Sequence, residues 1–525
     1  MGKSGDSAGD VAKIIRPELF FCLGAASGTD THTVTEALST ELRSVGYTPV
    51  PIRLSSLMAT LPGLEYLAGL EADDERIRES IKAGNRIRRL EGSADAVVRL
   101  AIAQVQRTRS ETNADSDVSV PAEGVCYIIS SLKRKEEIDT LRQIYSKQVF
   151  LISIYEPRES RIENLSRRIA RSRKAPDERT YRSVAEEIID TDQKERGDAF
   201  GQRLEDVFPL ADVFLKAGNS VRSDVRRFIQ LLFGAPFITP TADEFLMFHA
   251  RSTAARSADL SRQVGAVIAT PKGEILSTGC NEVPRAGGGV QWDDVAGKDE
   301  DYRDYKLGVD AAAAAKIEIV SGAMKELQRA GWLKDEYSSK TPEDLALLAL
   351  FEDKKPLAGT MISSLLEFGR IVHAEMAAIS DAAMRGVAIK DSSLFCTTFP
   401  CHMCARHIIA AGVKRVVYIE PYPKSRAKRL YKRAIQVDED RDADDDAVKF
   451  EAFVGVSPTR FFDLFDFIER KDSHGYAHSE AAPSRGPKGV SVASFSSELE
   501  SVYFSSMSRA DWSEAALENK TGEAQ

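Results

Sequence analysis

The sequence contains no apolar run that approaches the roughly 18–20 residues of a membrane-spanning helix. Its first residues, MGKSGDSAGD, are small and polar, and they lack the apolar stretch of a secretory signal. Cysteine is scarce too, since the six in 525 residues are too few and too scattered for a disulfide framework. We therefore expect a cytoplasmic protein that has no membrane partner.

An excess of positive charge is also missing. Lys and Arg number 71 against 80 Asp and Glu, which gives a net charge of −9. This balance disfavours a broad nucleic-acid surface, although an acidic enzyme can still bind phosphates through a local basic pocket. The residues that are present, 43% hydrophobic and 29% charged over 525 positions, are typical of a globular protein of two to four domains.

Residues 1–235 show apolar runs that alternate with helical patterns. This alternation predicts an α/β domain made of βαβ units around a mostly parallel sheet. The expected strands cover residues 18–27, 47–56, 124–132, 148–157 and 212–218.

A glycine-bearing loop, residues 24–31 (GAASGTDT), follows the first of these strands and precedes a helix. This is the context of a phosphate-binding P-loop, whose backbone N–H groups hold an anion. The loop departs from the P-loop pattern because its glycines are one residue closer and its lysine is missing. We therefore predict a degenerate P-loop NTPase/kinase-like regulatory domain without kinase activity, in which Gly24, Gly28 and Thr29 bind a nucleotide.

Residues 236–470 form a second region, in which helices again alternate with strands. A strand–turn–strand hairpin is expected over residues 263–282, and the charged, helical stretch of about 286–359 is an insertion. Residues 471–525 are rich in Ser, Ala and Gly and are expected to form a C-terminal tail, in which a short helix near residues 495–504 can dock.

The chemistry of the second region is concentrated in two motifs, His373-Ala374-Glu375 and Pro400-Cys401-His402-Met403-Cys404. Zinc prefers thiolate and imidazole ligands, and a catalytic zinc site uses three of them and leaves the fourth tetrahedral position to water. Cys401 and Cys404 are spaced to share one helix face, and the start of that helix lowers the pKa of a thiol. We therefore predict Zn²⁺ as the cofactor, held by Cys401, Cys404 and His373.

Glu375 is the residue that distinguishes a catalytic site from a structural one. Two thiolates cancel the charge of zinc, so a nearby general base is useful. On an ideal helix, positions 373 and 375 lie about 200° apart, so both reach one site only if the metal lies off the start of the helix. From there Glu375 can take a proton from water and pass it to a departing amine.

Three other readings of these motifs stay open. A C-x-x-C pair alone is also typical of a redox site or a structural zinc site. His402 and His407 are alternative ligands, although their positions favour surface or packing roles. The remaining cysteines, Cys22, Cys280 and Cys396, are expected to be small core residues.

The segments SADLSRQVGAVI, GEILSTGCNEVP, HAE and TTFPCHMCARHIIAAGVKRVVY resemble the deoxycytidylate deaminase branch of the cytidine deaminase superfamily. The whole chain is similar, more specifically, to the anti-phage dCTP deaminases, in the segments LGAASGTD, RGDAFGQRLEDVFPLADVFL, ARSADLSRQVGAV and NEVPRAGGGVQW. The resemblance implies a P-loop-like parallel-sheet domain followed by a cytidine deaminase-like α/β/α sandwich with a five-stranded mixed sheet.

The resemblance also implies an activity: zinc-dependent deamination of dCTP or dCMP to the uracil nucleotide and ammonia, in antiviral defence by nucleotide depletion. Glu375 would be the proton shuttle, and Asn281, Ser261 and Arg262 would bind substrate. Further candidates to bind a triphosphate are Lys424, Ser425, Arg426, Lys428 and Arg429.

Regulation and assembly are expected from the same resemblance. The N-terminal domain would control the deaminase, in some members through a small RNA, and we expect a homo-oligomer. The alternatives are a tRNA or single-stranded DNA base deaminase, a housekeeping dCMP deaminase, and a nucleoside-phosphate kinase, which the missing P-loop lysine disfavours.

Overall fold

The structure is a computed structural model, which describes residues 16–113, 117–193, 195, 198–293, 301–352, 355–365, 367–420, 425–437, 444, 446–478, 486–490, 497–505 and 512. The chain divides into two units: unit 1 comprises Met1–Glu244 and Val454–Gln525, and unit 2 comprises Phe245–Phe453. In the part of the chain that the structure describes, no helix has the length and apolar character needed to cross a membrane.

Unit 1 is built on a six-stranded sheet in the order β12-β5-β4-β1-β3-β2. Five of its strands are parallel and lie where the sequence predicts them: β1 (Leu19–Ala25), β2 (Thr48–Arg53), β3 (Val125–Ser130), β4 (Val149–Tyr155) and β5 (Val213–Lys216). β2 carries Pro49 and Pro51, which are tolerated because β2 is an edge strand.

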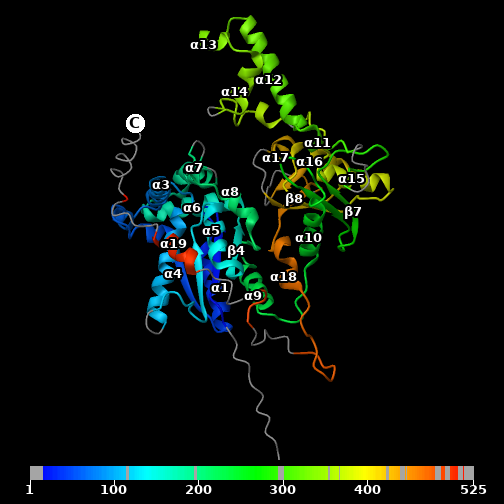
Figure 1. Ribbon diagram of the computed structural model, residues 1–525. Coiled ribbons are helices and arrows are strands. Elements are labelled where there is room, and N and C mark those ends of the chain that lie inside the picture. The colour runs from blue at the N-terminus through cyan, green and yellow to red at the C-terminus, as the bar shows by residue number, and fades with distance from the viewer. Residues whose placement is uncertain are drawn as a thin grey trace, which may run out of the picture. The chain divides into compact units, whose positions relative to one another are not determined.

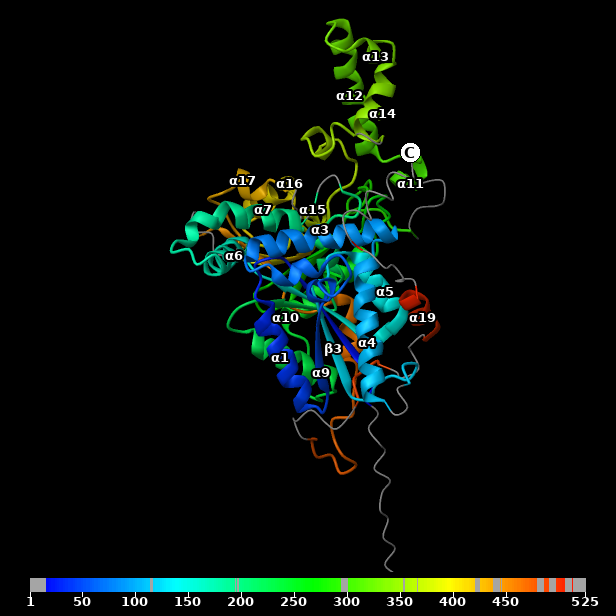
Figure 2. The same cartoon turned by 90° about the vertical axis from the view of Figure 1, so that its left-hand side faces the viewer.

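Helices cover both faces of this sheet (Figure 2). α1 (Thr31–Ser44) and α9 (Val221–Leu232) pack on the face that carries Phe21. On the other face Phe20 stacks on Tyr145 of α5 (Lys135–Tyr145). The other helices of residues 54–207 are α2 (Leu54–Met58), α3 (Asp73–Glu91), α4 (Arg99–Thr112), α6 (Arg158–Ser172), α7 (Arg182–Gln193) and α8 (Leu204–Val207).

After residue 453 the chain adds three further elements to unit 1. β12 (Gly455–Val456) pairs antiparallel with β5, so the sheet is mixed, and α18 (Phe461–Phe465) follows. In α19 (Ser497–Ser505), Glu500 accepts hydrogen bonds from Arg109 at 2.7 Å and from Tyr145 at 2.6 Å. The sequence predicts that residues 454–470 belong to the second region, whereas the structure places them in unit 1. The prediction is wrong here because β12 pairs with β5, and Glu500 with Arg109, across long stretches of sequence, and such pairing leaves no pattern in the local sequence.

Unit 2 contains a second mixed sheet, in the order β10-β11-β9-β8-β6-β7. The expected hairpin is antiparallel, β6 also pairs antiparallel with β8, and the other pairs are parallel. Its strands are β6 (Gly265–Ala269), β7 (Ile275–Cys280), β8 (Ser393–Thr398), β9 (Arg415–Glu420), β10 (Ile435–Val437) and β11 (Val448–Ala452). The sheet thus has six strands, not five, because a three-residue edge strand such as β10 is too short to show alternation.

The helices of unit 2 fall into two groups. One group covers the sheet: α10 (Ala242–Ala254), α15 (Ala374–Met384), α16 (His402–Ala410) and α17 (Ala427–Leu430). The other lies in the expected insertion, where α12 and α14 share a small apolar cluster and stand off from the sheet (Figure 1). The insertion contains α11 (Asp304–Leu307), α12 (Ala311–Arg329), α13 (Asp335–Ser338) and α14 (Pro342–Leu350).

Candidate active site and metal centre

The two helix starts of the predicted motifs converge on one point of unit 2. His373 is the N-cap residue of α15, and Cys401 is the N-cap residue of α16. Cys404 lies in the first turn of α16, so its side chain returns toward the same helix start. A metal held by these residues lies off the starts of both helices, which is the arrangement that the spacing of His373 and Glu375 requires.

A glycine in the neighbouring strand fixes the position of α15. A Cβ added to Gly279 of β7 would lie 2.3 Å from the carbonyl oxygen of Ala374 and 2.4 Å from the backbone nitrogen of Ala378. Helix and strand therefore touch backbone to backbone, and the alanines of α15 leave room for this approach. This close packing fixes the positions of His373 and Glu375 relative to the sheet.

The three predicted zinc donors form one compact cluster. Cys401 Sγ and Cys404 Sγ lie 3.4 and 3.3 Å from His373 Nδ1, and the two sulfurs are 3.6 Å apart. In tetrahedral zinc sites with Zn–S near 2.3 Å and Zn–N near 2.0 Å, donors stand about 3.5–3.8 Å apart, so the cluster fits this ion. Among the described residues, it is the one group of three or more His, Cys, Asp or Glu donors that can hold a metal ion.

The protonation of the cluster favours a cation. The hydrogen bond between the two cysteine sulfurs, together with the nearby His373, lowers the pKa of Cys401 to about 4, so this sulfur is a thiolate at neutral pH. The hydrogen bond with Cys401 raises the pKa of His373 to about 9. A metal ion displaces the protons that His373, Cys401 and Cys404 share. Metal binding therefore releases protons, and the affinity for the metal rises with pH.

Glu375 is a buried carboxyl beside the donors. It is the second residue of α15, its exposed fraction is 4%, and it lines the adjacent cavity. Burial raises its pKa, and the charge of Cys401 acts in the same direction. A raised pKa makes the carboxylate a stronger base, which favours its taking a proton from water as a proton shuttle does.

The cavity beside the cluster has a volume of about 250 Å³ and contains the predicted substrate residues Asn281, Ser261 and Arg262 in its wall. The Asn281 side-chain oxygen accepts a hydrogen bond from Val264 N at 2.6 Å, and its amide donates to Asp259 at 3.0 Å and to the Arg262 carbonyl at 2.8 Å. Asn281 therefore holds the 259–264 loop in place as well as lining the cavity.

Two cations of the cavity wall were missed by sequence reasoning. Lys316 comes from α12 of the insertion, and Arg370 precedes His373. Arg370 is paired with Asp304 at 2.8 Å, whereas Lys316 has no carboxylate within ion-pair distance among the described residues. The sequence predicts an insertion over about 286–359 and assigns none of its residues to the site. The signal that could have found Lys316 is the start of α12, where Asp310 caps a helix that carries Lys316 six residues later.

Other predicted residues lie away from this cavity. His402 Nε2 is 3.9 Å from Glu367 and is not among the donors. Ser425 donates a hydrogen bond to the Pro400 carbonyl at 2.8 Å, so it supports the loop before Cys401 and does not face the cavity. Arg426, Lys428 and Arg429 are absent from the cavity wall as described, and Lys424 lies outside the described residues.

In unit 1, the glycine loop is bonded to the protein itself. Ser27 N donates to Asp192 at 2.7 Å, and Lys133 Nζ lies 2.7 Å from the same carboxylate. Gly28 has φ +89°, and a Cβ there would lie 2.5 Å from the Arg161 carbonyl oxygen of α6, so packing alone requires this glycine. Gly28 and Thr29 border a large cavity, and Gly24 lies behind them against Ser153. Nucleotide binding by the loop stays a prediction.

Comparison with known proteins identifies the type of the metal centre. Residues 240–420 match the family described as "Cytidine and deoxycytidylate deaminase zinc-binding region". This range includes all three donors and Glu375, so the match and the donor cluster together confirm the predicted zinc cofactor.

Individual relatives match only a short part of the chain. The deoxycytidylate deaminase of Enterobacteria phage T4 is 40% identical over 55 residues, which are 10% of this chain and 28% of the relative. ComE operon protein 2 of Bacillus subtilis (strain 168) is 42% identical over 53 residues, which are 10% of this chain and 28% of the relative. The chain thus spans less than a third of the length of these curated relatives. The solved dCMP deaminase of cyanophage S-TIM5 in apo form has 18% identity and a TM-score of 0.21, over 41% of this chain and all of that chain.

Proposed function

We propose that unit 2 is a zinc-dependent hydrolytic deaminase of deoxycytidine nucleotides, which converts dCTP or dCMP to the uracil nucleotide and ammonia. The observation that carries this proposal is the pairing of a three-donor centre with the buried Glu375. A structural zinc site has four protein donors and no use for such a carboxyl group. The match of residues 240–420 to the deaminase family supports the same reaction class.

The chain's own residues account for the proton transfers. Zinc, when bound at His373, Cys401 and Cys404, supplies a Lewis acid that lowers the pKa of a water molecule. Glu375 accepts a proton from the water that attacks C4 of the cytosine ring; the C4–O bond forms, the C4=N3 double bond opens, and Glu375 passes this proton to N3. Glu375 then carries the proton of the new hydroxyl group to the exocyclic amine, the C4–N bond breaks, the C4=O double bond forms, and ammonia leaves.

The wall of the cavity fits a nucleotide that carries phosphate. Three cations line it: Arg370 is paired with Asp304 at 2.8 Å and Arg262 lies 3.6 Å from Glu420, which leaves Lys316 as the cation for a phosphate. Ser261 and Asn281 present polar groups suited to a sugar or a base edge. Because α12 contributes Lys316, the insertion supplies part of the phosphate side of the site. This placement favours a free nucleotide over a polynucleotide, whose binding requires an open basic groove.

The setting of this activity is part of the proposal. The resemblance to anti-phage dCTP deaminases supports a cytoplasmic homo-oligomer that depletes deoxycytidine nucleotides in antiviral defence, with unit 1 as its regulatory part, controlled by a small RNA in some members. The Asp192 carboxylate bonded to the glycine loop supports a regulatory role, since it would repel a phosphate at the loop. Unit 1 would then lack kinase activity.

The test measures ammonia release by the purified full-length protein from dCTP, dCMP, CTP, CMP and a single-stranded oligonucleotide. We expect ammonia from a deoxycytidine nucleotide, and its loss in Glu375→Gln but not in Asp381→Asn, a matched change on the same helix outside the cavity wall. Ammonia from the oligonucleotide alone would overturn the proposal in favour of a polynucleotide deaminase.

A further inference from the structure

A cavity of unit 1 lies where three parallel strands end. Its volume is about 1110 Å³, and its wall includes residues that follow β1, β2 and β3. β1 has β3 and β4 as neighbours, and the chain crosses from one side of β1 to the other between β3 and β4. Such a switch point at the carboxyl ends of parallel strands is where open α/β sheets bind ligands.

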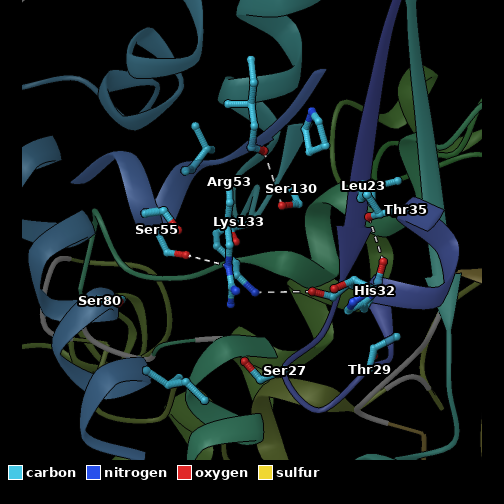
Figure 3. A pocket seen from close by; sticks show the side chains of 18 of the residues that line it. Leu23, Ser27, Thr29, His32, Thr35, Arg53, Ser55, Ser80, Ser130 and Lys133 are labelled. Carbon is cyan, nitrogen blue, oxygen red and sulfur yellow. Dashed lines mark hydrogen bonds between the residues drawn. The ribbon is translucent and has the colours of Figure 1, made fainter. Parts of the chain in front are cut away.

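Positive charge is concentrated in this cavity, although the chain as a whole is acidic. Seven Lys and Arg side chains line it among the described residues, against the two carboxylates of Glu36 and Asp192. Figure 3 labels Arg53, from the end of β2, and Lys133, from the loop after β3, among the side chains that line the cavity. A cavity of this kind attracts anions because its walls focus the field of its charges.

The cations beside the glycine loop are already neutralised. Lys133 is paired with Asp192 at 2.7 Å, and Arg88 is paired with Glu137 at 2.7 Å. These pairs leave little free charge at that end of the cavity. An incoming anion is therefore drawn to a different part of the wall.

Two arginines, Arg76 and Arg168, share the Asp73 carboxylate, and Arg53 lines the same cavity. Asp73 accepts from both Arg76 and Arg168, the latter at 3.2 Å. Arg53 has no carboxylate within ion-pair distance among the described residues, and its Nε donates to Ser55 Oγ at 3.1 Å. Arg53, Arg76 and Arg168 line the same cavity, and two of them bond one carboxylate. Burial, followed by the charges of Arg76 and Arg168, lowers the pKa of Arg53, in keeping with this placement.

This arginine cluster, Arg53, Arg76 and Arg168, carries two more positive charges than Asp73 balances. A dianion placed among the three would remove the repulsion and offer each guanidinium a paired acceptor. The rest of the wall combines hydroxyl groups with an apolar floor. The hydroxyl groups include those of Ser27, Ser55, Ser80, Ser130 and Thr35, and the buried apolar residues include Leu23, Ile52, Leu54 and Ile128.

We propose that the unit 1 cavity binds a phosphorylated small molecule, and that its phosphate monoester group binds the arginine cluster, away from the glycine loop. The volume of about 1110 Å³ lies just above the range of about 300–1,000 Å³ that is typical of ligand pockets, so it leaves room for a ligand of nucleotide size. The hydroxyls suit sugar hydroxyl groups, and the apolar floor suits the flat remainder of such a ligand. The proposal assigns ligand binding to residues outside the P-loop-like motif and is independent of the deaminase reaction.

The experiment is calorimetric titration of the full-length protein with AMP, ribose 5-phosphate and inorganic phosphate, in separate runs. None of these carries the cytosine amine that the proposed reaction removes, so turnover does not interfere. We expect one or more of them to bind, and Arg53→Gln to weaken that binding about tenfold or more through loss of a charged hydrogen-bond donor. Binding of AMP alone would show that the base contributes, and binding of all three that the phosphate suffices.

Two further variants make the result specific. Arg107→Gln, an equal charge change at an exposed residue of α4 outside the cavity wall, should leave binding unchanged. Arg53→Lys keeps the charge and loses the planar guanidinium group, so it should bind the probes with an affinity between those of the wild type and Arg53→Gln. It replaces Arg53→Gln in the test if that variant fails to fold. Absence of binding of all three probes to the wild-type protein, or equal binding by the wild type and a folded Arg53 variant, would overturn the proposal.

Discussion

Each unit holds a cavity at the ends of its parallel strands, and the two cavities differ in the kind of side chain around them. The unit 2 cavity is bordered by a thiol, an imidazole and a buried carboxyl group, all of which change protonation. The unit 1 cavity is bordered mainly by guanidinium and hydroxyl groups, which keep theirs at neutral pH. The first set can move protons in a reaction, whereas the second can only hold an anion.

The helix starts at the two cavities differ in the same way. In unit 1 the Asp30 carboxylate caps α1 by accepting from Thr33 N at 3.1 Å, so the first turn is satisfied internally. In unit 2 the cap residues are His373 and Cys401, and neither makes a side-chain cap bond. The comparison teaches that the Asp30 cap uses its carboxylate within its own helix, whereas His373 and Cys401 keep their donor atoms for a metal.

Removing a zinc ligand should produce the largest effect. Cys401→Ala or Cys404→Ala should lose both zinc and ammonia release, because two donors remain where zinc requires three protein ligands. Elemental analysis and the ammonia assay measure the two outcomes, and AMP titration should show an unchanged unit 1. Stoichiometric zinc in either variant would contradict the assignment.

Changing the proton shuttle should separate catalysis from metal binding. Glu375→Gln should retain zinc and lower kcat about 10²–10⁴-fold, because proton transfer is lost while the donors stay in place. Elemental analysis and steady-state kinetics check this, with Asp381→Asn as the control. Near wild-type turnover of Glu375→Gln would show that Glu375 is not the proton-transfer group. The unit 2 cavity would then resemble the unit 1 cavity in lacking such a group.

A change in the buried charge network should act on unit 1 alone. Glu500→Ala removes one of the two carboxylates that face the fully buried Arg109, and the other, Glu18, lies 2.6 Å away. We expect a loss of about 3 kcal/mol in the free energy of unfolding of unit 1. Denaturant unfolding followed by tryptophan fluorescence measures it, while the zinc content of the variant should stay unchanged. A loss of zinc would show that the units are not independent in stability.

The smallest effect concerns the phosphate side of unit 2. Lys316→Ala should raise KM for the deoxycytidine nucleotide about tenfold and leave kcat nearly unchanged, because the lysine contacts substrate far from the reacting carbon. Lys325→Ala, an exposed change on the same helix, is the control. An equal KM for Lys316→Ala and Lys325→Ala would show that the insertion is not part of the substrate site.

The strands and the metal donors could be predicted from sequence because each depends on neighbours in the chain. β1 is an apolar run, and Cys401 and Cys404 are three residues apart. The walls of the two cavities could not be predicted in this way. Lys316 and His373 line one cavity, and Arg53 and Arg168 line the other, only because the fold brings them together. The glycine loop shows the same limit, because the Asp192 carboxylate that accepts from its Ser27 N–H belongs to a helix more than 160 residues away in sequence. The pairing of β12 with β5 was missed for this reason too.

The interrupted course of unit 1 sets an order on folding during synthesis. β5 and Arg109 leave the ribosome before unit 2 is made, whereas β12 and Glu500 leave after it. While unit 2 is being translated, the edge of β5 lacks its partner strand and Arg109 lacks one of its two carboxylates. Unit 2 is continuous in sequence and has its whole sheet as soon as β11 is made. The unit encoded second is therefore the first to be completed, and the unit encoded first is completed last.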